Sequence, residues 1–210
     1  MRYKILKILT ILFLLQLGRI FAKSFIFSFV ERSLFSDTLV SILYMLVLTV
    51  LAIILLRKKK IEINMFPYNF NKSYIVCSLL FTSFFIFTLF ITKNFNLYGF
   101  LSLFYNAIIT VIFEEIIFRG CVYKEISLLT NEWIAYLGST ILFSFWHIGY
   151  IDTVIWRTSL FFQEANILEI MFWKVITGML LGVIIGFFRY KNKNIYSSFL
   201  VHSLINTFGG

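Results

Sequence analysis

Helix-breaking and ionisable residues are scarce in this sequence. Among its 210 residues there are one proline, two cysteines and two histidines, and charged residues make up 14% of the chain. So little charge excludes an ordinary soluble domain, in which roughly 25% of residues are charged. A single proline argues against a loop-rich fold, because proline interrupts helices and marks turns. A structural disulfide is not expected, since Cys77 and Cys121 both lie in apolar segments outside any CxxC pair.

Apolar residues fill most of the chain: they make up 60% of it, and 27 residues are phenylalanine. This composition predicts an all-α polytopic membrane protein. With roughly 20 residues needed per span, there is room for about seven transmembrane helices and for no soluble domain, so residues 1–210 form a single transmembrane domain. We expect helices at 5–22, 38–56, 74–92, 97–123, 132–150, 167–188 and 194–208. The alternative count is eight, with an additional span in the loop after Lys23.

The formal charge of +9 reflects topology rather than nucleic-acid binding, because the basic residues cluster between the apolar runs. Twelve of them lie at the amino terminus and in the loops after the second, fourth and sixth expected helices, against four in the other loops. The positive-inside rule places the amino terminus in the cytosol and, with seven spans, the carboxyl terminus outside. The first apolar run lacks a small-residue cleavage site, so an uncleaved signal anchor is expected.

Both histidines and a pair of adjacent glutamates lie inside apolar runs: Glu114-Glu115, His147 and His202. Ionisable groups in hydrocarbon cost about 2.5–3.5 kcal/mol or more each and are mostly functional. Carboxylates and imidazoles move protons, activate water or bind metal. Glu114 and His147 are equidistant from the turn between their helices, so in an antiparallel pair they lie at the same depth.

Spacing assigns roles within these runs. Glu115 and Arg119 are four residues apart on one helical face and can form an ion pair. This pairing leaves Glu114 facing elsewhere and makes it the better candidate for chemistry. The alternative is that all three form a structural ion cluster. Phe143, four residues before His147, is expected to support the imidazole by packing.

His202 and Asn206 are also four residues apart, and both can donate hydrogen bonds. Two convergent donors suit the oxyanion of acyl transfer. The alternative is hydrogen bonding between helices, a common use of His and Asn in membranes. Glu114, His147 and His202 together also match a catalytic zinc set, although no HExxH helix is present.

Glu-Glu-x-x-x-Arg from Glu114, Phe-x-x-x-His from Phe143 and His-x-x-x-Asn from His202 occur in that order in apolar helices. This arrangement resembles the CAAX-protease-and-bacteriocin-processing (CPBP, or Abi) family of intramembrane endopeptidases. The resemblance covers roughly residues 97–208, which would be the catalytic core, and no motif position is substituted.

The resemblance implies a CAAX-endopeptidase-like bundle whose site opens toward the cytosol. It implies that Glu114 and His147 activate a water, that His202 and Asn206 stabilise the oxyanion, and that Glu115 gives support with Arg119. Both a metal-free glutamate mechanism, requiring no cofactor, and a metalloprotease mechanism with a single zinc are open; Asn206 beside His202 favours the first.

The expected substrate is a peptide or small membrane-associated protein in a bacterial plasma membrane, processed in bacteriocin or signalling-peptide maturation or in self-immunity. A non-catalytic immunity or regulatory protein of the same fold is the alternative. A proton-coupled transporter is a third reading, but no inverted repeat is evident. A two-aspartate protease is not expected, because Asp37 and Asp152 are assigned to loops. Gly178, with Gly182 and Gly186, forms a ridge for close helix packing.

Overall fold

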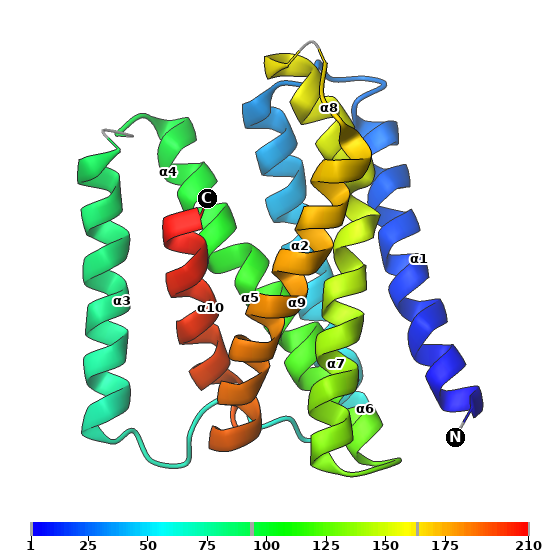
Figure 1. Ribbon diagram of the computed structural model, residues 1–210, viewed down its shortest axis with the longest axis vertical. Helices are drawn as coiled ribbons and strands as arrows, with labels where there is room; N and C mark the ends of the chain where they lie inside the picture. The colour runs from blue at the N-terminus through cyan, green and yellow to red at the C-terminus, as the bar shows by residue number, and fades with distance from the viewer. Residues whose placement is uncertain (1, 93–94, 163, 210) are drawn as a thin grey trace.

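The computed structural model is a bundle of long helices that run up and down beside one another (Figure 1). It describes residues 2–92, 95–162 and 164–209, and these residues form helices joined by turns, with no strand among them. The elements are α1 Arg2–Ile26, α2 Leu34–Lys58, α3 Lys72–Ile91, α4 Leu97–Phe104, η1 Tyr105–Ile109, α5 Thr110–Glu114, η2 Glu115–Val122, α6 Tyr123–Ser127, α7 Glu132–Trp146, η3 His147–Tyr150, α8 Ile151–Phe161, α9 Ile167–Asn192 and α10 Ile195–Gly209.

Two of the helical stretches are composite. Elements α4 to α6 form one continuous stretch of 31 residues, and α7, η3 and α8 form another of 30 residues. Together with α1, α2, α3 and α9, the described residues contain six helices long and apolar enough to cross a membrane. Helix α10 has 15 residues, about 22 Å, which is less than the roughly 30 Å hydrocarbon core. The predicted all-α polytopic membrane fold is confirmed.

Several boundaries differ from the prediction, and two of these differences move an aspartate into a helix. The Ser33 hydroxyl accepts the Ser36 N–H in a capping box, so α2 begins at Leu34 and includes Asp37. After the tighter turn η3, the chain continues as α8, which includes Asp152. The assignment of both aspartates to loops was therefore wrong. The short connection between α1 and α2 also leaves no room for an eighth span.

Asparagine side chains set the start of four helices. The side-chain oxygens of Asn71, Asn96, Asn131 and Asn166 each accept the backbone N–H three residues later, at the first turn of α3, α4, α7 and α9. Such caps satisfy a donor that the helix itself leaves free. Polar residues in an apolar chain therefore mark where these four helices begin.

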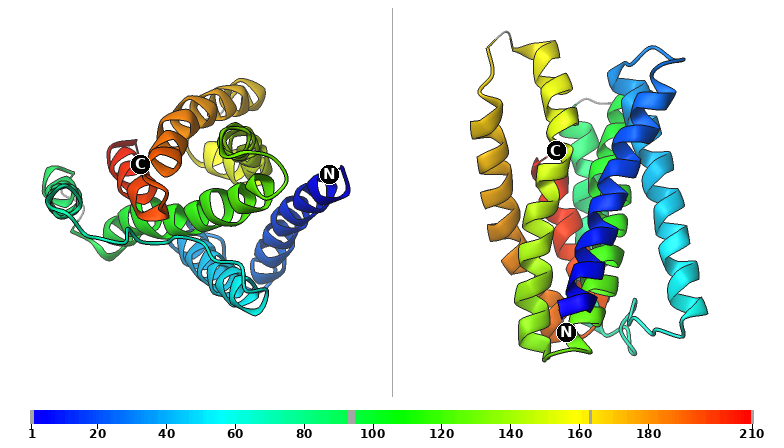
Figure 2. Two further views of the ribbon diagram at one scale, coloured as in Figure 1. Left: turned by 90° about the horizontal axis from the view of Figure 1, so that it is seen from below. Right: turned by 90° about the vertical axis from the view of Figure 1, so that its right-hand side faces the viewer.

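The stretch from α4 to α6 lies at the centre of the bundle. It packs against α2 on one side and against α7 and α10 on the other, as the view from below shows (Figure 2). Its Phe113 and Phe118 join Phe143 and Trp146 of α7 in the main apolar core. Helix α3 stands apart at the edge, with none of its residues buried, and is attached through α10 (Figure 1).

The three glycines of α9 face α7 and the start of η3, which confirms the predicted close helix packing. A Cβ at Gly186 would lie 2.9 Å from the Thr140 hydroxyl and 2.9 Å from the Tyr136 ring. A Cβ at Gly182 would lie 3.1 Å from the Phe143 ring, and one at Gly178 would lie 3.1 Å from His147 Nδ1. The ridge therefore lets α9 approach the helix that carries Phe143 and His147.

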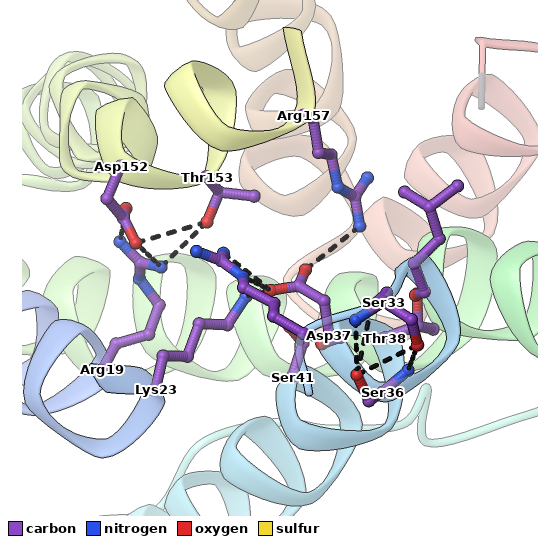
Figure 3. A network of polar contacts seen from close by, with 12 residues as sticks. Arg19, Lys23, Ser33, Ser36, Asp37, Thr38, Ser41, Asp152, Thr153 and Arg157 are labelled. Carbon is purple, nitrogen blue, oxygen red and sulfur yellow. Dashed lines mark hydrogen bonds and ion pairs between the residues drawn. The ribbon is translucent and has the colours of Figure 1, made fainter. Parts of the chain in front are cut away.

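A buried ion cluster closes the upper end of the bundle in Figure 1, around Asp37 (Figure 3). Asp37 has no exposed surface and pairs with Lys23 at 2.9 Å, Arg32 at 2.8 Å and Arg157 at 3.5 Å. These three are among the four basic residues counted on the poorly charged side of the topology; the fourth, Lys93, lies outside the described residues. The cluster ties α1 and α8 to α2.

We expect Gly186→Val to destabilise the protein, because the added side chain has no space against Tyr136 and Thr140. Overpacking of this kind costs about 1–3 kcal/mol. The measurement is unfolding of the purified protein in mixed micelles, followed by tryptophan fluorescence. The matched control is Val183→Ile, which adds volume on an exposed face of α9. Equal stability of the two variants would contradict the proposed role of the glycine ridge.

Candidate active site

The two glutamates lie where the central stretch changes its helical geometry. Glu114 is the last residue of α5, and Glu115 is the first residue of the π-helical η2. Only 3% of Glu114 and 1% of Glu115 are exposed. Wide π turns are rare and are often found at functional sites. This segment holds two adjacent carboxylates in the interior of the bundle.

His202 of α10 contacts both carboxylates. Its Nδ1 lies 2.9 Å from Glu115 Oε1, and its Nε2 lies 3.7 Å from Glu114 Oε2. Since a carboxylate accepts, Nδ1 is the donor in the shorter contact. Glu114 was expected to face elsewhere than the Glu115–Arg119 pair, and among the described residues it forms no ion pair with Arg119. Because α10 packs across both α5 and η2, one imidazole reaches both carboxylates.

Arg119 is fully buried beneath this pair. Its Nε lies 3.7 Å from Glu115 Oε1, which confirms the predicted ion pair. The guanidinium carbon lies 4.1 Å from the centre of the Phe143 ring, and Nη2 donates to the Gly182 carbonyl at 3.5 Å. Among the described residues, Glu115 Oε2 and Arg119 Nη1 have no hydrogen-bond partner. Each is a buried polar atom with capacity for a water or a substrate amide.

His147 occupies the first position of η3 and is half-buried. Its Nδ1 lies 2.9 Å from the Phe143 carbonyl oxygen. A carbonyl can only accept, so Nδ1 carries the hydrogen and Nε2 presents its lone pair. The Phe143 ring packs against both imidazoles, with ring centres 4.9 Å from His147 and 5.7 Å from His202, which confirms its predicted packing against His147. Within the described part of the chain, His147 and Glu114 share no hydrogen bond.

Asn206 lies one turn after His202 and is half-buried. Its amide nitrogen donates to the backbone carbonyl of Asn106 at 3.0 Å. One of its two amide hydrogens therefore joins α10 to η1, which is the interhelical role left open from the sequence. The second hydrogen remains for another acceptor.

Lys174 of α9 is a charged neighbour that the motifs did not include. It is half-buried, and its Nζ lies 5.8 Å from the centre of the ring of Tyr150, the last residue of η3. Its position inside an apolar run was the available signal, since such lysines seldom face lipid. Asn106, whose carbonyl holds Asn206, lies in the same kind of run.

The zinc set considered from the sequence was Glu114, His147 and His202. No group of three or more His, Cys, Asp or Glu side chains is arranged to hold a metal ion within residues 2–92, 95–162 and 164–209. Nδ1 of His147 and Nδ1 of His202 are used by other partners, so Nε2 is the nitrogen of each ring that a metal could bind. The residue types suit zinc, but their placement does not fit a three-ligand centre.

We expect Arg119→Ala to destabilise the fold by about 3–5 kcal/mol, because it leaves Glu115 as a buried charge without its ion-pair partner. Unfolding in mixed micelles measures this loss. Adding Glu115→Gln to the variant removes the stranded charge and should recover part of the stability. A single variant as stable as the wild type, or a double variant less stable than the single one, would contradict the ion-pair account.

Comparison with known proteins places this geometry in a family. The family model for type II CAAX prenyl endopeptidases, Rce1-like, matches residues 94–208. The UPF0177 protein YxdF of Lactococcus lactis subsp. lactis (strain IL1403) is 29% identical over 104 residues, which are 50% of this chain and 45% of that protein. The chain therefore spans less than half of the length of this relative. No solved structure matches. The family model matches more than half of the chain, and the bundle contains two buried carboxylates in contact with one imidazole. The chain therefore belongs to the Rce1-like family of CAAX-type intramembrane proteases.

Proposed function

We propose that this protein is an intramembrane endopeptidase that hydrolyses a peptide bond in a membrane-associated peptide or small protein. The observation that carries the proposal is the contact of His202 with both Glu114 and Glu115 in a buried site. Buried ionisable groups at this depth serve structure or chemistry. Arg119 already balances one carboxylate, which leaves the second for chemistry.

Glu114 is the general base in this proposal. It takes a proton from a water, the hydroxide oxygen bonds to the carbonyl carbon of the substrate, and the carbonyl oxygen becomes an oxyanion. Glu114 then returns the proton to the amide nitrogen as the carbon–nitrogen bond breaks. In this proposal His147 orients the water by accepting its second hydrogen on Nε2, because Nδ1 donates to the Phe143 carbonyl.

His202 and Asn206 are the oxyanion donors in this proposal. Nδ1 of His202 is used by Glu115, so the hydrogen bond to the oxyanion comes from Nε2, which requires the imidazolium form. The Glu114 and Glu115 carboxylates together balance this imidazolium and the Arg119 guanidinium. Asn206 contributes the amide hydrogen that Asn106 does not use. Two fixed donors aimed at one developing charge are what stabilises such a transition state.

The membrane orientation follows from charge in the same proposal. The amino terminus and the connections after α2, α6 and α9 lie at the same end of the bundle, the lower end in Figure 1. These segments hold most of the basic residues, which supports a cytosolic amino terminus in a bacterial plasma membrane. At the other end, Asp37 neutralises much of the positive charge.

The partners we propose are a peptide substrate and bilayer lipid. An apolar groove of about 280 Å³ lies between α1, α2 and the central stretch, with Lys59 and Glu125 among its lining residues. Its apolar lining suits a hydrocarbon chain. We propose that its role is maturation of a bacteriocin or signalling peptide, or self-immunity.

Glu114→Gln should abolish cleavage and leave folding unchanged, because the amide keeps the volume but cannot accept the proton. The assay incubates the purified protein, in bilayer discs, with a membrane-peptide fraction and identifies new amino termini by mass spectrometry. Glu62→Gln, in an exposed loop, is the matched control and should cut like the wild type. Cleavage by the Glu114→Gln variant at the wild-type rate would rule out the general-base role. No cleavage by the wild type would favour the non-catalytic immunity or regulatory alternative.

The glutamate mechanism and the zinc mechanism differ in their response to metal removal. We expect cleavage to survive dialysis against a strong chelator, and Asn206→Ala to cost about 2.7–4 kcal/mol of transition-state stabilisation. Metal analysis of the active protein, together with kcat and KM of the variant, makes the measurement. Three results together would overturn the glutamate mechanism: one bound zinc per chain, activity that chelation abolishes reversibly, and an Asn206→Ala variant with nearly wild-type activity.

A further inference from the structure

Two polar residues of α1 are buried in the bundle, although they lie outside the motifs and outside the residues matched by the family model. Gln16 is 8% exposed and Arg19 is 4% exposed. Both lie in a helix that is otherwise mostly apolar. Polar side chains in such a position need partners inside the protein, since the hydrocarbon offers none.

Their partners are backbone carbonyls at the turn that begins with His147. Gln16 Nε2 donates to the Trp146 carbonyl at 3.1 Å, and Arg19 Nη2 donates to the Gly149 carbonyl at 2.6 Å. These two carbonyls lie on either side of His147 in the chain. Helix α1 therefore holds η3 at two points, across about 130 residues of sequence.

The two donors are themselves fixed. Arg19 Nε donates to Gln16 Oε1 at 2.9 Å, so the amide oxygen is held while its nitrogen reaches Trp146. Arg19 also forms an ion pair with Asp152 and donates to the Thr153 hydroxyl at 3.2 Å (Figure 3). A guanidinium with several partners in one plane keeps a defined orientation. The hydrogen bond from Arg19 to the Gly149 carbonyl of η3 requires this orientation.

The turn is shaped to receive these groups. A Cβ at Gly149 would lie 2.3 Å from Gln16 Cδ and 2.5 Å from Gln16 Nε2. Any side chain at this position would displace the Gln16 amide from the Trp146 carbonyl. The turn itself is a short 3₁₀ segment, whose hydrogen bonds are poorer than those of an α-helix, so outside contacts count for more in setting its geometry.

We infer that Gln16 and Arg19 are positioning residues that set the orientation of His147 by holding η3 through the Trp146 and Gly149 carbonyls. This inference rests on the proposed peptidase function. It gives the Gln16–Arg19 segment of α1 a positioning role in addition to its role as part of a membrane span. A shift of η3 by about 1 Å would misplace the imidazole and lower kcat by up to about 100-fold.

The test compares three single variants with the wild type, in the full-length protein in bilayer discs. Gln16→Leu removes both amide contacts, and Gly149→Ala displaces the amide while leaving residue 16 intact. Each should lower kcat at least about tenfold with KM changed little, since the substrate still binds but the imidazole is misplaced. The Gln16→Leu/Gly149→Ala double variant should be no worse than the more damaged single one, because both remove the same contact.

Lys23→Met is the matched control for a merely structural role. Lys23 lies one turn further along α1 and ties it to Asp37 of α2, not to η3. This variant should lower stability and leave kcat unchanged. If Gln16→Leu and Gly149→Ala also lowered only stability, or if their effects on kcat simply multiplied in the double variant, the positioning role would be wrong.

Hydrogen exchange separates this inference from the proposed function. Amides of His147–Tyr150 should exchange faster in Gln16→Leu and Gly149→Ala than in the wild type, with no change in Lys23→Met. Unchanged exchange in both would overturn the inference even where the wild type cleaves peptides and Glu114→Gln does not. Failure of the wild type to cleave any peptide would overturn the proposed function, and faster exchange would then still show that α1 holds the turn.

Discussion

Four ionisable side chains meet inside an apolar bundle, and their contacts with one another offset the cost of burying each of them. His202 touches Glu114 and Glu115, and Glu115 also touches Arg119. Removing one partner from a buried ion pair is far more damaging than replacing the whole pair, because the remaining charge has no solvent. The surrounding helices therefore keep α5, η2 and α10 in one arrangement. Any chemistry at Glu114 depends on this constraint.

The remaining helices serve that arrangement in different ways. The glycines of α9 let it lie close to α7, so that Phe143 sits between the two imidazoles and over the Arg119 guanidinium. Helix α1 reaches η3 from the other side through hydrogen bonds. The tight turn at His147 and the wide π turn after Glu114 are both departures from α-helical geometry. Both occur at a candidate site residue. Departures from regular helical geometry are expected at functional sites.

Hydropathy alone predicted the helical segments, because each span must satisfy its own backbone and must be apolar over its length. It did not predict that α8 follows η3, since an amphipathic stretch after a tight turn reads as a loop. The i,i+4 rule predicted the Glu115–Arg119 pair, because both residues are on one helix. The contact of His202 with both glutamates joins residues about 90 positions apart and depends on how α10 crosses α5 and η2. Periodicity within a helix contains no information on that crossing, and the same holds for Gln16 and the Trp146 carbonyl.

Nitrogen-labelled histidine offers the most direct measurement on the buried site, because the chain has only two histidines. Imidazole nitrogen spectra of the protein in bilayer discs report which ring nitrogen carries the hydrogen. The account predicts a hydrogen on Nδ1 of both rings, and a change at His202 but not at His147 when Glu115 is replaced by Gln. A His202 ring with a bare Nδ1, or a His202 signal that does not respond to Glu115→Gln, would contradict the pairing on which the proposed site is built.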